Sequence, residues 1–297
     1  MSQQKQINLR EKRDIGQVVN TAFAFLRISY FKMFRDLLLF SSPFFIITGI
    51  CMGMVQFDKP AEFAGLNVYY FMDPMYYAAI ASGFLGTALC MSIVGNYLKQ
   101  YAETGSSQFD RTAIYKNIRS NFGGFLGVSL FYYAATLGGL VFLIIPGIYF
   151  SVANALARPA YILENNGERE SMSIGKSFSE SRRLITDNWW RTFGLFYILY
   201  FLVAIISFVF FIPQGILQFL IAFNSAKGID MEGYRLYYIL SSVLGQIGQG
   251  LLFPISVSAW FIYYFSLKES KDQTDLLATI DSIGAKPTTK TEDEGSY

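Results

Sequence analysis

The chain contains no histidine among its 297 residues. This absence excludes a Ser-His-Asp triad, a histidine proton relay, and any zinc, copper, haem or non-haem iron site that relies on imidazole ligands. The two cysteines, Cys51 and Cys90, both lie inside apolar stretches, so a disulfide framework or thiolate metal cluster is not expected. We therefore predict no metal site, no cofactor and no enzymatic activity.

Charged residues are also scarce, at 15% of the chain, whereas a soluble domain of this length carries about a quarter. They are absent from five runs that together cover about half the chain: residues 37–57, 74–98, 120–157, 192–226 and 236–267. A helix needs about 20 apolar residues to cross a bilayer core about 30 Å thick. The pattern predicts an all-α, multi-pass membrane protein. A net charge of +2 without a basic stripe argues against nucleic-acid binding.

The lengths of the runs and the positions of proline predict six transmembrane helices. A single helix over the third run would be too long for one crossing, so Pro146 and Gly147 are expected to break it, and Pro213 to divide the fourth run. Pro254 is expected to kink the last helix. The predicted spans are residues 37–55, 76–98, 122–145, 147–163, about 20 residues from Thr192 to near Pro213, and 236–267; residues 214–223 are expected to lie at the interface.

The distribution of lysine and arginine predicts the orientation. Of the 24 such residues, 21 fall in the N-terminal segment, the tail and the alternate connections on the same side, and this side is cytoplasmic by the positive-inside rule. We expect a cytoplasmic amphipathic segment over residues 1–36, a membrane domain over 37–267 and a disordered cytoplasmic tail over 268–297. The first span, rather than a cleavable signal sequence, is expected to direct insertion.

This orientation makes a direct prediction. A reporter that works only in the cytoplasm should be active when fused after Tyr297 and inactive when inserted near Glu62. Activity assays on the two fusions check it, and the reverse result would contradict the topology.

Three segments before the first, third and fifth spans carry apolar residues at helical spacing. The first contains Ile15, Val19 and Leu26, and the others repeat the pattern around residues 109–122 and 174–189. Amphipathic helices with cationic edges and aromatic ends lie in the headgroup plane. We therefore expect three interfacial helices, each followed by a two-span hairpin, as a threefold repeat.

Arg158 is the most informative single residue, because a guanidinium within a span is costly and often functional. Two interpretations remain open: contact with a lipid phosphate or a backbone carbonyl, and a role in substrate binding or gating. Asn154 shares its face on a continuous helix, whereas Glu164 lies on a different one. Pro159 is expected to free a backbone carbonyl beside Arg158.

A second polar stripe, formed by Ser242, Gln246 and Gln249, lies in the sixth span. Such side chains more often join helices by hydrogen bonds than bind a solute, and both interpretations are kept. Small residues spaced four apart predict close helix packing in the same way. Two pairs have this spacing: Gly49 with Gly53, and Gly123 with Gly127.

The segment after the fourth span has mixed charge and ends in two tryptophans. Arg182 and Arg183 predict contact with anionic lipid or a plain solvated face, and Trp189 and Trp190 are candidate lipid contacts at the interface. A Gly-Lys-Ser sequence at residues 175–177 lacks the upstream glycine and strand of a nucleotide-binding loop. The C-terminal tail is a candidate docking peptide for a protein partner, and a homo-oligomer is allowed.

One region resembles a known family. It combines Ile145-Pro146-Gly147-Ile148-Tyr149, Pro159, Ile162-Leu163-Glu164, Ser173-Ile174-Gly175-Lys176-Ser177, Asn188-Trp189-Trp190 and Phe193. This pattern is similar to the signature of bacterial six-span families grouped around the glycerophosphoryl diester phosphodiesterase membrane domain. The resemblance covers about 50 residues and implies a bacterial cytoplasmic (inner) membrane and no established activity. Relatives labelled β-carotene monooxygenase would need four iron-binding histidines, which this chain lacks.

Three functions are considered. The first is a non-enzymatic membrane module that organises lipid, expected to be anionic, or a partner protein at the cytoplasmic leaflet. The second is a transporter or channel for a small or amphiphilic solute, which gains support if Asn154, Arg158, Gln246 and Gln249 converge on one cavity. The third, an intramembrane lipid-modifying enzyme, is weakest because no clustered carboxylates or nucleophile occur in the spans.

Overall fold

A computed structural model describes residues 7–58, 68–165, 172–225, 227, 229 and 231–284. These residues form α-helices and short 3-10 helices without any strand. The α-helices are α1 (Ile15–Phe40), α2 (Ser42–Asp58), α3 (Pro74–Thr104), α4 (Arg111–Phe142), α5 (Ile144–Ala153), α6 (Ala157–Glu164), α7 (Ile174–Ile185), α8 (Trp189–Ser225) and α9 (Arg235–Gly284). The 3-10 helices are η1 (Val68–Met72), η2 (Thr186–Asn188) and η3 (Glu232–Tyr234).

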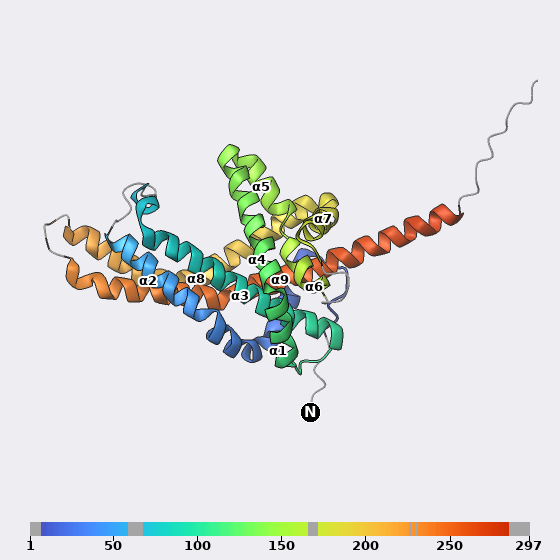
Figure 1. The fold of residues 1–297 in the computed structure, drawn as a ribbon, viewed down its shortest axis with the longest axis horizontal. Helices are drawn as coiled ribbons and strands as arrows, with labels where there is room; N and C mark the ends of the chain where they lie inside the picture. Colours follow the sequence, from blue (N-terminus) through green and yellow to red (C-terminus); the bar gives the residue numbers. More distant parts are fainter. Residues whose placement is uncertain are drawn as a thin grey trace, which may run out of the picture.

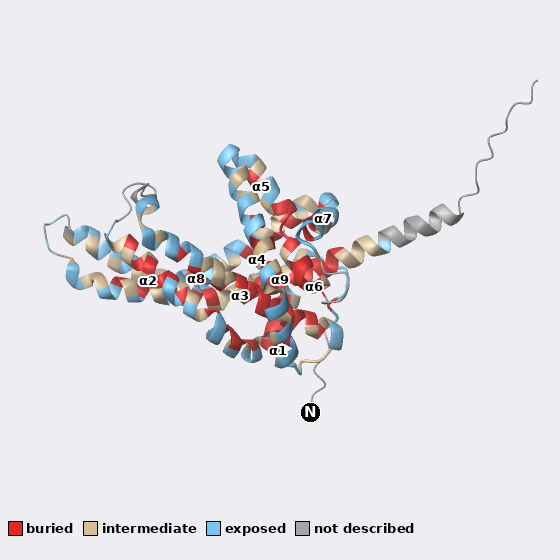
Figure 2. Cartoon of the chain, in the orientation of Figure 1, coloured by how far each residue is buried: buried red, intermediate tan, exposed pale blue. Residues whose placement is uncertain are grey.

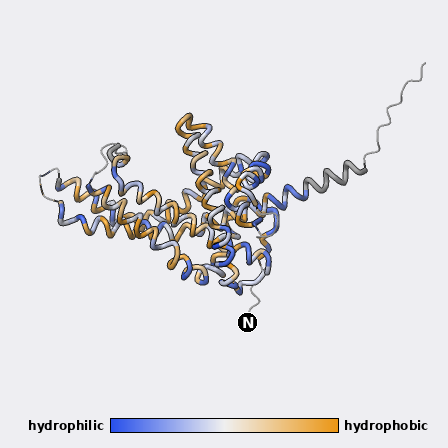
Figure 3. Tube along the Cα trace, in the orientation of Figure 1, coloured by the Kyte–Doolittle hydropathy of each residue, from blue (hydrophilic) through white to orange (hydrophobic). Residues whose placement is uncertain are grey.

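The helices form an elongated bundle with a projecting hairpin. Helices α2, α3, α8 and the first half of α9 run side by side, and α9 packs against all of the other three (Figure 1). The α4–α5 hairpin leaves this bundle and projects away from it (Figure 1). Its tip is exposed in Figure 2 and hydrophobic in Figure 3, as expected for a surface that faces lipid rather than water.

Short polar side chains cap the N-termini of several helices. Asp14 caps α1 in a reciprocal arrangement with Gln17, and Asp110 accepts hydrogen bonds from the first amides of α4. Asp73 does the same for α3, whose first residue is Pro74. These residues satisfy amide groups that have no partner within the helix, so the helix starts follow from local sequence.

Among the described residues, four helical stretches are long and apolar enough to cross a membrane: Pro74–Thr104, Arg111–Phe142, Ile174–Asn224 and Glu232–Gln273. The pair α1 and α2, bent by 53° at their junction, passes the same criteria together and raises the number to five. The predicted span over residues 147–163 is instead divided into α5 and α6, of 10 and 8 residues. At about 15 and 12 Å, neither crosses a bilayer alone.

The prolines mark some helix breaks and miss others. The break predicted at Pro146 and Gly147 lies instead at Leu143, whose backbone is extended, so that Pro146 falls in the first turn of α5. Pro159 likewise lies in the first turn of α6, after a turn over residues 154–156. First-turn amides need no helical partner, so proline is tolerated there.

The division predicted at Pro213 is wrong, because α8 continues through it to Ser225. Residues 214–223 are part of this helix, and the Nε2 of Gln214 donates to the Oε1 of Gln56 on α2 at 2.8 Å. The last helix, α9, also continues through Pro254.

The three predicted repeat units differ in structure. Helix α7 is amphipathic and is divided from α8 only by the short 3-10 helix η2, so the two belong to one helical stretch. The segment before the third span is continuous with it, because α4 runs from Arg111 without a break. The first unit bends at Ser41, between α1 and α2. The threefold repeat therefore stays a prediction.

The tail predicted to be disordered from residue 268 begins as a helix, because α9 extends to Gly284. Its start is fixed by ion pairs to the neighbouring helices: Lys268 with Glu164, Lys271 with Asp187 at 2.8 Å, and Asp272 with Arg183 at 3.3 Å. Residues 285–297, including the rest of the predicted docking tail, lie outside the described residues.

The N-terminal segment is also fixed to the bundle. The backbone amide of Arg13 donates to the Oγ of Ser266 on α9 at 2.8 Å, and the guanidinium of Arg191 donates to the Arg13 carbonyl. Burial lowers the pKa of the Arg13 guanidinium, and the neighbouring Glu11 carboxylate opposes this shift. These contacts join the segment before α1 to the start of α8 and to Ser266 in the second half of α9.

Candidate functional site

A groove of about 780 Å³ lies between the bundle and the α4 arm of the hairpin. Its walls are largely aromatic and aliphatic, and its polar groups are few. The lining residues come from α2 (Phe45), α3 (Tyr77, Ile80, Ala81, Gly83, Phe84, Thr87), α4 (Leu130, Tyr133, Ala134, Leu137) and α9 (Gln246, Gln249, Gly250, Phe253). A volume of this size fits a drug-sized or lipid-like ligand.

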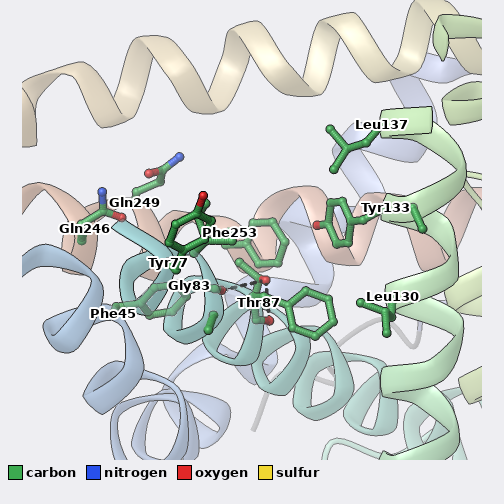
Figure 4. Close-up of a pocket in the computed structure, with 15 residues that line it drawn as sticks. Phe45, Tyr77, Gly83, Thr87, Leu130, Tyr133, Leu137, Gln246, Gln249 and Phe253 are labelled. Carbon is green, nitrogen blue, oxygen red and sulfur yellow. Dashed lines mark hydrogen bonds between the residues drawn. The ribbon is translucent and has the colours of Figure 1, made fainter. Parts of the chain in front are cut away.

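The two glutamines lie together at one end of the groove, and Tyr133 and Leu137 lie at the other (Figure 4). Gln246 is half-buried and Gln249 is exposed, and neither side chain has a hydrogen-bond partner among the described residues. They therefore do not join helices in the way that Gln214 and Gln56 do. Their amides instead provide donors and acceptors to whatever occupies the groove.

Arg158, the second residue of α6, lies close to this groove without lining it. Its Cζ is 4.3 Å from the ring centroid of Tyr132 and 5.5 Å from that of Tyr133. The Tyr133 ring lines the groove and makes an edge contact with Phe84 at 5.8 Å. Arg158 and the groove therefore share a wall.

Asn154 lies apart from the groove. Helix α5 ends at Asn154, which is its C-cap. Asn154 and Arg158 are therefore not on one continuous helix and do not share the face that was expected. The Nδ2 of Asn154 donates to the Phe150 carbonyl at 2.9 Å, and its Oδ1 is buried with no partner in the part of the chain that the structure describes. Of the four residues predicted to converge, Gln246 and Gln249 line the groove and Arg158 lies beside it, whereas Asn154 does not.

The remaining predicted residues have other partners. Glu164 accepts hydrogen bonds from Tyr264 and Lys268 on α9 rather than from Arg158. Arg183 binds Glu180 at 2.9 Å and also pairs with Asp272, which ties α7 to α9. Arg182 is exposed on the face of α7. Glu164 and Arg183 thus support the packing of α9.

Trp189 and Trp190 line a second groove, of about 790 Å³, between α5 and the start of α8. Trp189 stacks between Tyr149 at 6.0 Å and Phe193 at 5.2 Å. Trp190 is 77% exposed. This arrangement is typical of tryptophans that anchor a helix at the membrane interface.

Sequence reasoning missed the α3 and α4 walls of the first groove. Tyr132 and Tyr133 are adjacent tyrosines in a long uncharged run, but Tyr76–Tyr77, Tyr237–Tyr238 and Tyr263–Tyr264 are too, so the pair carried no specific signal. Tyr77, Phe84 and Thr87 carried none that separates them from the other residues of α3. Among the described residues, no group of three or more histidine, cysteine, aspartate or glutamate side chains is placed to hold a metal ion.

Comparison with models of known protein families, with curated proteins and with solved structures finds no match for this chain. Its function is therefore argued from the groove and its surroundings.

Proposed function

We propose that this chain is a non-enzymatic membrane module that holds the apolar chain of a lipid in the groove between α3, α4 and α9. The observation that carries the proposal is the groove itself, with its apolar walls and two unpaired glutamine amides. The bilayer supplies such chains at high concentration to every concave apolar surface in it. A multi-pass arrangement in a bacterial cytoplasmic membrane, with six spans and both termini cytoplasmic, is part of the same proposal.

A transporter or channel for a small solute is the second candidate. Gln246 and Gln249 favour it, because both amides face one cavity. No charged side chain lines that groove among the described residues, whereas paths for polar solutes are usually lined by ionisable groups and water. The groove therefore favours an apolar chain over a hydrophilic solute.

Filling the groove should displace its occupant. Ala81 on α3 and Ala134 on α4 are both exposed residues of its wall, so a tryptophan at either position places an indole in the groove without clashing with the core. We expect Ala81→Trp and Ala134→Trp to reduce the lipid retained by the purified protein at least fivefold. Native mass spectrometry of protein extracted gently from its own membrane measures the retained lipid.

The matched control is Ala204→Trp, which adds the same side chain to an exposed position on α8 outside the groove. It should retain as much lipid as the wild-type chain. Equal retention in the control and in both groove variants would overturn the proposal, as would a wild-type chain that carries no lipid.

A further inference from the structure

The charge of Arg158 is unbalanced. No carboxylate pairs with it among the described residues, since Glu164, the acidic residue at the end of the same helix, binds Tyr264 and Lys268. The faces of Tyr132 and Tyr133 attract the guanidinium, but a cation–π contact does not neutralise its charge. A guanidinium whose Nε is buried without a hydrogen bond among the described residues favours an anionic ligand.

Polar atoms of Arg158 and of the neighbouring helix α4 also lack a hydrogen-bond partner. The Nε of Arg158, the Oγ of Ser129 and the Oγ1 of Thr136 are all buried without a hydrogen bond among the described residues. One face of α4 carries Ser129 and the residues three, four and seven positions after it, which are Tyr132, Tyr133 and Thr136. The Arg158 guanidinium lies on the two tyrosines of this face, and the two hydroxyls lie about one turn before and one turn after those tyrosines along α4.

Unpartnered buried donors and acceptors are rare in native proteins, because each loses its hydrogen bonds to water without gaining others. Two hydroxyls and a guanidinium are the groups that bind phosphate oxygens, and arginine does so through two parallel hydrogen bonds. Arg158 is only partly buried, so the rest of its side chain is accessible to a ligand.

The position of Arg158, Ser129 and Thr136 relative to the groove indicates which kind of anion they would bind. Tyr133 forms part of the groove wall and also contacts Arg158. Arg158 precedes Glu164 by six residues, or about 9 Å along a helix, which is within reach of lipid headgroups. A lipid with its chain in the groove would therefore carry its headgroup close to the guanidinium.

We propose that Arg158, Ser129 and Thr136 bind the phosphate of a phospholipid whose acyl chain lies in the groove. This inference rests on the function proposed above and adds the headgroup chemistry. The same cluster can accept free phosphate, so the experiment has to separate these two sources.

The test compares two lipids that differ only in phosphate. Delipidated protein in detergent is titrated with phosphatidylglycerol and with diacylglycerol of the same chains, and native mass spectrometry records the bound fraction. We expect the wild-type chain to bind phosphatidylglycerol at least tenfold more tightly than diacylglycerol. Arg158→Gln should remove this preference without weakening the binding of diacylglycerol, and Arg158→Lys should restore part of it because the charge returns without the paired hydrogen bonds.

Two further variants keep the test decisive. Arg119→Gln removes one positive charge from an exposed position on α4 and should leave the preference intact. If Arg158→Gln does not fold, the double variant Ser129→Ala with Thr136→Val removes the flanking hydroxyls and should lower the preference severalfold.

The outcomes distinguish the two proposals. Equal binding of both lipids by the wild-type chain would overturn the phosphate site and leave the groove proposal standing. Binding of neither lipid would overturn both. Full displacement of phosphatidylglycerol to the level of diacylglycerol by micromolar inorganic phosphate would assign the site to free phosphate and overturn the lipid headgroup, whereas a preference that survives micromolar phosphate supports the headgroup.

Discussion

Replacing Gly49 with alanine is expected to lower the thermal stability of the detergent-solubilised protein markedly. A Cβ at this position would lie 2.5 Å from the Cα of Val243 on α9. The obstacle is backbone, which cannot rotate away as a side chain would, so α2 and α9 must separate along their contact. Overpacking of this kind costs about 1–3 kcal/mol. A shift in the unfolding midpoint, followed by intrinsic tryptophan fluorescence, measures the loss.

Gly123 on α4 provides the matched control, because a Cβ there would meet nothing within 4 Å. Gly123→Ala should raise the midpoint slightly, since alanine is favoured over glycine within a helix by about 1 kcal/mol. Equal shifts for the two variants would contradict the close approach of α2 and α9 at Gly49.

The glycine pairs also show what the sequence can and cannot predict about packing. The pair Gly49 and Gly53 was expected to lie at a close helix contact, and both glycines face the backbone of α9. Gly123 and Gly127 have the same spacing, yet Gly123 faces open space and Gly127 meets only the side chain of Ile174. Small residues permit close approach, but the pattern does not contain the neighbouring helix that decides whether the approach occurs.

Proline positions also predicted only some of the helix breaks. Pro146 and Pro159 each follow a helix break by a few residues, whereas Pro213 and Pro254 lie within continuous helices. In a membrane, neighbouring helices and local adjustments satisfy the carbonyl that proline leaves free. Whether a given proline ends a helix therefore depends on tertiary contacts that local sequence does not specify.

The site was predictable only where a residue was unusual for its surroundings. Arg158 and the two glutamines differ from the apolar runs around them, and all three lie in or beside the groove. The aromatic walls were not predictable, because 29 phenylalanines and 20 tyrosines are spread through the chain and nothing local separates Tyr133 from the others. The hairpin geometry that brings Tyr133 between Arg158 and the groove is a tertiary property.

Removal of the Asp36 carboxylate is the second change expected to have a large effect. Asp36 is on α1 and has 0% of its surface exposed. Its Oδ2 accepts a hydrogen bond from the Tyr97 hydroxyl on α3 at 2.6 Å and lies 3.8 Å from the Nε of Arg111, the first residue of α4. One buried carboxylate thus joins α1, α3 and α4, and none of its contacting residues lines the groove.

Asp36→Ala should leave the buried Tyr97 hydroxyl with only the Lys32 carbonyl, 3.4 Å away, as an acceptor, at a cost of about 1–3 kcal/mol. The ion pair with Arg111 adds less than about 1 kcal/mol, because that guanidinium is partly exposed to solvent. Tyr97→Phe should cost a similar amount, since it leaves the buried carboxylate without its hydrogen-bond donor. Unfolding midpoints of the two single variants and of the double variant measure these costs.

The double variant is the decisive member of the set. Two groups in direct contact do not contribute independently, so the combined loss should be smaller than the sum of the single losses by at least 0.5 kcal/mol, the lower end of the range of about 0.5–3 kcal/mol for contacting residues. Arg35→Gln is the control, since that side chain is 70% exposed beside the same carboxylate and should shift the midpoint little. Additive losses would mean that Tyr97 and Asp36 stabilise the fold separately, and the three-helix junction would then have to be held by apolar packing alone.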